Sequence, residues 1–357
     1  MKKSKRILIT VFARASWGGL HEHVLDEARA LVRAGFTVYV VCAESRLAIR
    51  LRALGVCVIT VDWEDMNSAE VRVLESVSYI DLIHAHPFNS RDLGLRLASA
   101  FSSPIIVTLH GNYLDYANSW AAKVDHVVFV SDALRDNFLS KVAGVAGSKT
   151  TVIPNGVNNS IFQRQPLSLL EKTNNESIRV VVASRLDADK AHVVRSTASV
   201  AQQVRSVFPE SRVIVEVLGE GSLSDDVIKE LTCEDVEVRF LGWRLSENVY
   251  KYLRRAVIAV CPGRSAAQSL AVGTPVFAVG SQGPTGLQVD KKLLTGLWSN
   301  FGGYPVEFYE DACSIPALLT DRESYRRAQA LGRATIELGN KQSIVDAKLI
   351  ALINSFI

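Results

Sequence analysis

Short runs of apolar residues alternate with helical patterns along the whole chain. In the first half, the apolar runs are 6–12, 37–43, 56–63, 81–86, 104–111, 126–131 and 150–154. Most of them are rich in Val and Ile and almost unbroken, which is typical of strands buried on both faces of a parallel sheet. Between the first two runs, Leu20, Val24, Ala28 and Leu31 form one helical stripe. This alternation of strand and helix predicts a doubly wound α/β domain.

A second series of apolar runs follows a polar segment, 163–177, which predicts a linker. The second series consists of 178–185, 212–219, 236–242, 257–261 and 275–280, with helical patterns between the runs. From residue 321 to the end the pattern is helical only. We therefore predict two Rossmann-like domains, 1–165 and 166–340, and a C-terminal helix over 341–357.

Composition and charge exclude several classes of protein. The 357 residues include 40 Lys and Arg and 37 Asp and Glu, so the formal net charge is only +3. A protein that coats nucleic acid usually has a larger basic excess, so no nucleic acid partner is expected. No apolar run approaches the roughly 20 residues of a membrane span, and the run after the basic N-terminus is too short for a signal peptide. The five scattered cysteines favour buried free thiols in the cytoplasm over disulfides or a zinc site.

Ligands of open α/β sheets bind at the carboxyl ends of the strands, and candidate residues follow several strands. Gly18 and Gly19 come after the first strand and open a helix, where backbone amides favour an anion, although a tight turn also explains them. His84, His86 and His110 all lie at strand ends. His84 and His86 face the same way, but no third ligand has a recognisable spacing, so we predict no metal site. His110 is placed to donate a hydrogen bond to a ligand.

The loop 184–190 follows the first strand of the second domain. Arg185 and Lys190 can converge on one anion from its two ends, and two cations suit a diphosphate leaving group. A solvated charged turn is the alternative. The triplet from Asp187 to Asp189 also has the form Asp-x-Asp, which binds a metal–diphosphate in another class of sugar transferases, but here it directly precedes a lysine.

Two more loops of the second domain add candidate contacts. Gly219, Glu220 and Gly221 end a strand, but position 224 is serine, so the dinucleotide fingerprint is absent. The segment 262–268 also follows a strand and opens a helix. The amides of Ser265 and Ala266 are expected to face a bound phosphate if the helix starts there.

Several short motifs, in one order, resemble the retaining nucleotide-sugar glycosyltransferases of family four, which have the GT-B fold. The motifs are 17–24, Ile83-His84-Ala85-His86, Thr108-Leu109-His110-Gly111, Ile153-Pro154-Asn155-Gly156-Val157, Ser184-Arg185-Leu186 with Lys190, Leu218-Gly219-Glu220-Gly221 and Gly273-Thr274-Pro275. The resemblance implies an acceptor domain, 1–165, and a donor domain, 166–340, facing a central cleft. It also implies that the last helix packs back on the first domain.

The resemblance implies roles for the candidate residues. Arg185 and Lys190 are expected to hold the donor diphosphate without a metal or other cofactor. Gly18 and Gly19 are expected to line the cleft near this diphosphate. His110 is expected to contact the donor sugar, and Glu220 to border the nucleoside. In the implied reaction, the acceptor hydroxyl attacks from the leaving-group face. The leaving phosphate oxygen takes its proton, and the anomeric configuration is retained.

One motif departs from the family. Of the two glutamates that usually surround the last donor loop, the first position falls at Val260 and the second at Gln268. Glutamine still binds ribose hydroxyls, but more weakly than a carboxylate does. Arg264, beside the helix start, is expected to compensate by binding a phosphate or an acidic sugar.

The resulting prediction is transfer from a nucleoside-diphosphate sugar, with a UDP-sugar favoured, to a hydroxyl in cell-envelope polysaccharide, glycolipid or natural-product biosynthesis. The alternatives are an inactive relative acting as a binding subunit, a sugar-nucleotide epimerase or phosphorylase of the same fold, and more distantly an oxidoreductase. Basic residues near the N-terminus, with Arg46 and Arg50, either contact the inner face of the membrane peripherally or are ordinary solvated charges.

Overall fold

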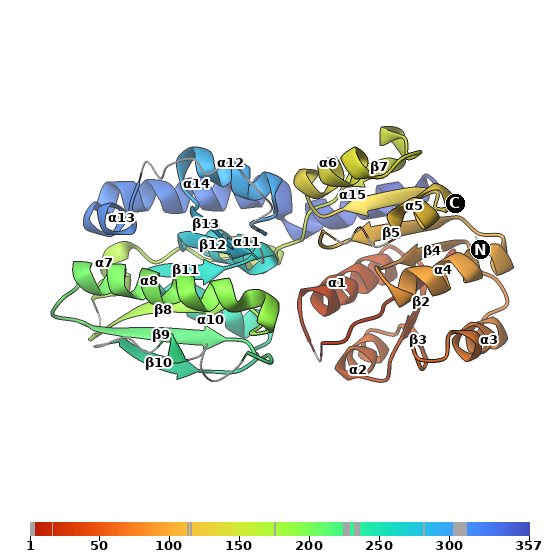
Figure 1. Cartoon of the computed structure of the whole chain (residues 1–357), viewed down its shortest axis with the longest axis horizontal. Helices are drawn as coiled ribbons and strands as arrows, with labels where there is room; N and C mark the ends of the chain where they lie inside the picture. Colours follow the sequence, from red (N-terminus) through yellow and green to blue (C-terminus); the bar gives the residue numbers. More distant parts are fainter. Residues whose placement is uncertain are drawn as a thin grey trace. The chain divides into compact units, whose positions relative to one another are not determined.

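The computed structural model describes residues 4–15, 17–112, 114, 116–174, 176–223, 229–231, 236–280, 283–302 and 313–357. The chain divides into two compact units. Unit 1 comprises Met1–Asn155 and Ser343–Ile357, and unit 2 comprises Gly156–Gln342. Each unit contains one sheet with helices packed against it (Figure 1).

Unit 1 contains a seven-stranded parallel sheet in the order β3-β2-β1-β4-β5-β6-β7. Its strands are β1 (Arg6–Thr10), β2 (Thr37–Cys42), β3 (Cys57–Thr60), β4 (Leu82–Ala85), β5 (Ile105–Leu109), β6 (His126–Phe129) and β7 (Thr150–Val152). Its helices are α1 (Gly19–Arg33), α2 (Arg46–Ala53), α3 (Met66–Ser76), α4 (Asn89–Phe101), α5 (Ala117–Trp120), α6 (Asp132–Lys141) and α15 (Gln342–Asn354). The first residue of α15, Gln342, is assigned to unit 2, and the rest of this helix belongs to unit 1. Every strand thus falls within a predicted apolar run.

Both faces of the unit 1 sheet are buried. Ile7, Leu8 and Ile9 of β1 are all fully buried, although successive side chains of a strand point to opposite faces. Leu8 packs with residues of α3 and α4, such as Val73 and Leu93. Helices must therefore cover the other face as well, which is why the strand sequences are almost continuously apolar.

Unit 2 contains a six-stranded sheet in the order β10-β9-β8-β11-β12-β13, parallel except for the edge strand β13. Its strands are β8 (Ser177–Ala183), β9 (Arg212–Leu218), β10 (Val236–Phe240), β11 (Ile258–Cys261), β12 (Val276–Gly280) and β13 (Gly283–Leu287). Its helices are α7 (Leu169–Thr173), α8 (Ala191–Val207), α10 (Ser246–Arg255), α11 (Gly263–Ala271), α12 (Asp290–Trp298), α13 (Ile315–Thr320) and α14 (Arg322–Asn340). Both strand orders are those of a doubly wound fold, so the predicted fold class is confirmed.

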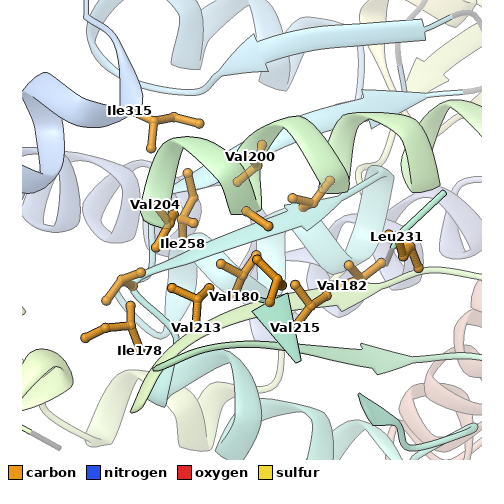
Figure 2. Close-up of a cluster of buried hydrophobic side chains, with 14 of the residues drawn as sticks. Ile178, Val180, Val182, Val200, Val204, Val213, Val215, Leu231, Ile258 and Ile315 are labelled. Atoms are coloured by element: carbon orange, nitrogen blue, oxygen red, sulfur yellow. The ribbon is translucent and has the colours of Figure 1, made fainter. Parts of the chain in front are cut away.

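The main core of unit 2 lies between the sheet and helix α8. Figure 2 shows Val200 and Val204 of α8 above Val180 of β8 and Val213 of β9. A second cluster, which includes Val181, Leu270 and Ile336, lies on the opposite face under α11 and α14. These two layers hold the strand ends, and therefore the loops that follow them, in fixed positions.

The structure differs from the sequence-based prediction of the domain organisation and of the cysteines. Residues 163–177, predicted as a linker, instead contribute α7 to unit 2, because Leu169 packs into its core and Lys172 is fully buried. The units divide at Asn155, upstream of the predicted boundary at 165, since Val157 and Ile161 belong to the unit 2 core. The cysteines are not all buried either: Cys57 is exposed, and Cys233 lies outside the described residues.

Candidate functional site

Most of the predicted site residues follow the strands at which the strand order of each sheet reverses direction, while His110 follows β5 and Glu220 follows β9, each next to such a strand. In unit 1 this point is between β1 and β4, which pair directly, and in unit 2 it is between β8 and β11. Loops that follow two such neighbouring strands diverge and leave a crevice for ligands. The residues form two groups, one in each unit: Gly18, Gly19 and His110 in unit 1, and Arg185, Lys190, Glu220, Arg264, Ser265, Ala266 and Gln268 in unit 2.

Gly18 and Gly19 form the start of α1. Gly18 is the residue before the helix, and its carbonyl accepts a hydrogen bond from the Glu22 amide at 3.2 Å. A Cβ atom added to Gly19 would meet no atom within 4 Å, so the backbone faces open space here. The Trp17 indole, 5% exposed, donates to Glu22 Oε1 at 2.9 Å and fixes the helix start. The first-turn amides of α1 therefore lie at the switch point, as an anion site requires.

His110 follows β5 and is held by a neighbouring histidine. Its Nε2 lies 2.8 Å from Nδ1 of His86, which follows β4. His84, two residues before His86, contacts Thr108 Oγ1 through Nε2 at 2.7 Å. His84 and His86 are both fully buried, whereas His110 is half-buried. His110 is thus the histidine of this group that reaches the surface of unit 1.

The structure adds Glu27 of α1, a residue that the sequence analysis missed. Its carboxylate accepts a hydrogen bond from Nδ1 of His84, and its Oε2 lies 3.4 Å from Nε2 of His86. Glu27, His84 and His86 place potential metal-ligand atoms within 4.8 Å of one another, so a third candidate ligand does exist. No local spacing points to Glu27, because it lies on a different element, far along the chain from both histidines.

Burial and charge set the protonation states in this cluster. Burial alone raises the pKa of Glu27, but the charge of His84 and the hydrogen bonds from His84 and His86 outweigh burial and lower this pKa far below its ordinary value. Glu27 is therefore an ionised carboxylate. Burial lowers the pKa of His86, and the hydrogen bond and charge of Glu27 oppose that effect only in part. His86 is therefore neutral near pH 7.

Arg185 and Lys190 converge on one oxygen atom. Lys190 Nζ lies 2.6 Å from Oδ2 of Asp189, and Arg185 Nη2 lies 3.8 Å from the same oxygen. Arg185 also forms an ion pair with Asp187, whose other oxygen accepts from the Ser222 amide at 3.3 Å. Each aspartate of the Asp-x-Asp triplet is thus paired with a cation of its own loop. The two cations are arranged to share one anionic oxygen.

The loop 219–221 packs tightly against the loop of Arg185. Gly219 has φ of +152°, and a Cβ there would collide with the Ser184 carbonyl oxygen. The Leu186 amide donates to the Glu220 carbonyl at 3.0 Å. The exposed Glu220 carboxylate accepts from the Trp243 amide at 3.1 Å, which ties it to the loop after β10. Glycine is needed here because two backbones touch.

Helix α11 begins at Gly263, two residues earlier than the sequence analysis assumed. The Ala266 amide donates to the Pro262 carbonyl at 3.3 Å, so the prediction that it faces a phosphate is wrong. Arg264 and Ser265 lie in the first turn, where amides have no partner within the helix. Gln268 is 5% exposed, and its Nε2 lies 3.5 Å from the Tyr250 hydroxyl. Arg264 is half-buried.

Comparisons with known proteins relate this chain to glycosyltransferases. Residues 17–160 match the model of Glycosyltransferase Family 4. Among curated proteins, none matches this chain. Within the part of the chain that the structure describes, no helix is long and apolar enough to cross a membrane.

Solved structures resemble the whole chain. HepE from Anabaena, in complex with UDP-glucose, is 18% identical with a TM-score of 0.74, over 98% of this chain and 99% of that one. Sucrose-phosphate synthase from Thermosynechococcus elongatus is 18% identical with a TM-score of 0.70, over 98% of both chains. A putative UDP-N-acetylglucosamine 2-epimerase from Listeria monocytogenes is 11% identical with a TM-score of 0.60, over 99% of this chain and 96% of that one. At such identities the likeness shows the fold, which is GT-B. Through its matched family domain, the protein is a glycosyltransferase with this fold.

Proposed function

We propose that the protein transfers a sugar from a nucleoside-diphosphate donor, with UDP favoured, to a hydroxyl acceptor, with retention of anomeric configuration and without a metal. The convergence of Arg185 and Lys190 on one oxygen carries this proposal. The leaving diphosphate gains negative charge as its bond to the sugar breaks. The two cations stabilise that charge. The HepE complex with UDP-glucose supports UDP as the nucleotide.

In the proposed reaction the acceptor hydroxyl attacks the anomeric carbon on the face from which the diphosphate leaves. The bond from the carbon to the phosphate oxygen breaks, a bond from the carbon to the acceptor oxygen forms, and the hydroxyl proton passes to the leaving phosphate oxygen. His110 contacts the donor sugar, and the amides of α1 near Gly18 and Gly19 lie beside the diphosphate. Such a reaction needs no pair of carboxylates at the spacing of glycosidases.

Arg264 and Gln268 complete the donor contacts in this proposal. Gln268 binds the ribose hydroxyls, and Arg264 compensates for the missing first glutamate by binding a phosphate or an acidic sugar. The hypothesis for Arg264 is tested by Arg264→Ala. Weaker donor binding is expected, and unchanged donor affinity and turnover would remove Arg264 from the site.

The acceptor is proposed to be a cell-envelope polysaccharide, a glycolipid or a natural product, used in the cytoplasm or at the inner face of the membrane. In unit 1, Lys5 pairs with Asp81 at 3.1 Å and Arg50 stacks over Trp17 at 4.6 Å. These two side chains therefore also serve the fold. Binding to anionic and neutral vesicles tests the membrane contact, and equal binding to both would rule out an electrostatic one.

The deciding experiment offers UDP-, GDP- and dTDP-sugars and follows nucleotide release with and without cell-envelope lipid. Release that depends on lipid supports transfer, whereas a protein that neither binds nor releases any nucleotide is an inactive relative. Activity that persists with a chelator supports metal independence, and NMR of the product reports the anomeric configuration. The likeness to a putative epimerase favours one alternative, which interconversion of UDP-sugars without transfer would establish.

A further inference from the structure

A buried chain of polar contacts connects the carboxylate of Glu27 to His110. Glu27 Oε2 lies 3.4 Å from His86 Nε2, which is long for a hydrogen bond. Both atoms are fully buried, and neither makes a hydrogen bond of ordinary geometry to any described residue, so the polar contact that links them is this ion-pair contact. On the opposite edge of the same ring, His86 Nδ1 lies 2.8 Å from Nε2 of His110. The chain therefore runs from helix α1 through the residue after β4 to the residue after β5.

The donor and acceptor of each contact follow from elementary chemistry. An ionised carboxylate only accepts hydrogen bonds, so His86 must present a proton on Nε2 toward Glu27. A neutral imidazole carries one proton, so His86 Nδ1 is then an acceptor. Since that acceptor lies 2.8 Å from His110 Nε2, the proton between the two rings belongs to His110.

We propose that Glu27 is a positioning residue that acts through His86 to hold His110 in one tautomer, with the proton on Nε2, and in one ring orientation. This inference rests on the proposed function only for its catalytic consequence, because His110 is the residue that contacts the donor sugar there. The assignment of the protons stands on the geometry alone. A histidine held in one tautomer offers the substrate a constant pattern of hydrogen bonds.

His84 holds the Glu27 carboxylate in place by a hydrogen bond to its other oxygen, Oε1. Both nitrogens of His84 are already in hydrogen bonds, one with Glu27 and one with Thr108 Oγ1. His23, one helical turn before Glu27, stands with its Nε2 4.0 Å from Glu27 Oε2, and its ring is 4.5 Å from that of His110. The carboxylate thus lies at the centre of the histidine cluster. This favours a hydrogen-bond network over a metal centre, in which His84 would have to give up a hydrogen bond.

The direct test is NMR of the protein labelled with ¹⁵N in its histidine rings, at about pH 8, where a free imidazole is neutral. Single substitutions of the histidines assign the signals. In the wild type, Nε2 of both His86 and His110 is expected to be protonated, and Nδ1 of both to be unprotonated. A His110 ring with its proton on Nδ1 would overturn the proposal, and this readout needs no enzymatic activity.

The variant Glu27→Gln removes the fixed acceptor while keeping the shape of the side chain. Its amide can also donate, so His86 can reverse its proton and His110 is expected to shift toward the tautomer with the proton on Nδ1. An unchanged His110 signal in the folded variant would contradict the proposal. Glu27→Asp keeps the carboxylate and is expected to keep the wild-type tautomer.

Kinetics provide the second readout. Glu27→Gln is expected to lower kcat about 10- to 100-fold, as other residues that orient a functional histidine do. UDP affinity is expected to stay within about twofold, because Glu27 is buried and is not among the proposed contacts of the nucleotide. The matched control is Asp26→Asn, which removes a charge from the adjacent position of α1, where Asp26 pairs with Arg29 at 2.7 Å. Equal kcat for the wild type and Glu27→Gln would overturn the role of Glu27.

Two further outcomes separate this proposal from others. If the wild type transfers no sugar, the proposed function fails, while the ring signals still decide the tautomer. If elemental analysis finds one equivalent of a transition metal that Glu27→Gln loses, Glu27 is a metal ligand and the proposal is overturned. Absence of such a metal in both proteins supports it.

Discussion

The ammonium group of Lys190 lies 2.6 Å from the Asp189 carboxylate, so this cation is paired inside its own loop before any ligand binds. A diphosphate must take the place of that carboxylate. Lys190→Met keeps the aliphatic chain and removes the charge. A hydrogen bond to a charged group contributes about 1.5–3 kcal/mol, so UDP affinity is expected to fall about 10- to 100-fold in titration calorimetry.

Lys251→Met is the matched control, since Lys251 is an exposed lysine of α10 in the same unit and contacts Asn248 at 3.3 Å. It is expected to bind UDP as the wild type does. If Lys190→Met also binds UDP with unchanged affinity, the loop 184–190 is not the diphosphate site.

Gly19→Ala tests whether a ligand approaches the start of α1. No atom lies within 4 Å of the added methyl group, so the free energy of unfolding is expected to stay the same or rise slightly, since Ala favours helices over Gly. If a diphosphate sits against this backbone, the methyl group overlaps it. The loss in kcat/KM is expected to correspond to about 1–3 kcal/mol, as for an overpacked site.

Gly94→Ala in α4 is the opposite case and serves as the control. Its Cβ would lie 2.9 Å from the Ala85 Cβ and 3.2 Å from the Ile105 Cδ1. Urea unfolding is expected to show a loss of about 1–3 kcal/mol, while kcat of the folded enzyme changes little. Wild-type kinetics for Gly19→Ala would place the diphosphate elsewhere.

The strands could be predicted from sequence because burial on both faces forces nearly continuous Val and Ile, as in β1 and β8. The edge strand β13 could not, because its sequence, Gly283–Leu287, contains two glycines and a proline and gains its order from pairing with β12. Helix α7 carried a readable signal, the capping box of Ser168 and Glu171, but it lies in a segment whose polar composition suggested a linker.

Part of the candidate site could be predicted from the rule that ligands of open α/β sheets bind at the carboxyl ends of the strands. This rule placed His110 directly after β5, and Arg185 and Lys190 in the loop that follows β8, and the structure has them in these positions. It could not find Glu27, because contact between α1 and the ends of β4 and β5 depends on helix packing that no local spacing encodes. It also misplaced the start of α11, since Gly263 begins the helix with φ of +47°, a conformation that a motif does not reveal.

Lys172 predicts a pH dependence of stability. Its side-chain nitrogen is buried and contacts Thr274 Oγ1 at 2.7 Å and Tyr325 Oη at 3.1 Å. Burial, with a contribution from the charge of Arg254, lowers the pKa of Lys172 well below the ordinary 10.5. Between this lowered pKa and 10.5, the unfolded chain binds a proton that the folded chain does not, so stability falls as the pH is lowered through this window.

Lys172→Met removes the amine that binds this proton, so the difference between the wild type and the variant reports the contribution of Lys172 to the pH dependence of stability. Between pH 7 and 10, the wild type is expected to gain stability relative to the variant, by up to about 1.4 kcal/mol per pH unit, as measured by urea unfolding. A difference that does not change with pH would mean that Lys172 stays protonated in the folded protein.

Gln268→Glu tests the departure from the glutamate motif. Gln268 is 5% exposed on α11, so a carboxylate there is desolvated and is expected to lower the melting temperature of the ligand-free protein. If the side chain binds the ribose, a charged acceptor strengthens that hydrogen bond by about 1 kcal/mol, and UDP affinity is expected to rise about fivefold. The control is Gln329→Glu on α14, where a 7% exposed glutamine donates to the Leu167 carbonyl at 2.8 Å. It is expected to lower stability without raising UDP affinity. A Gln268→Glu variant that binds UDP more weakly than the wild type would show that this position contacts the donor through the amide donor of glutamine, and therefore that the chain recognises its nucleotide differently from the family it resembles.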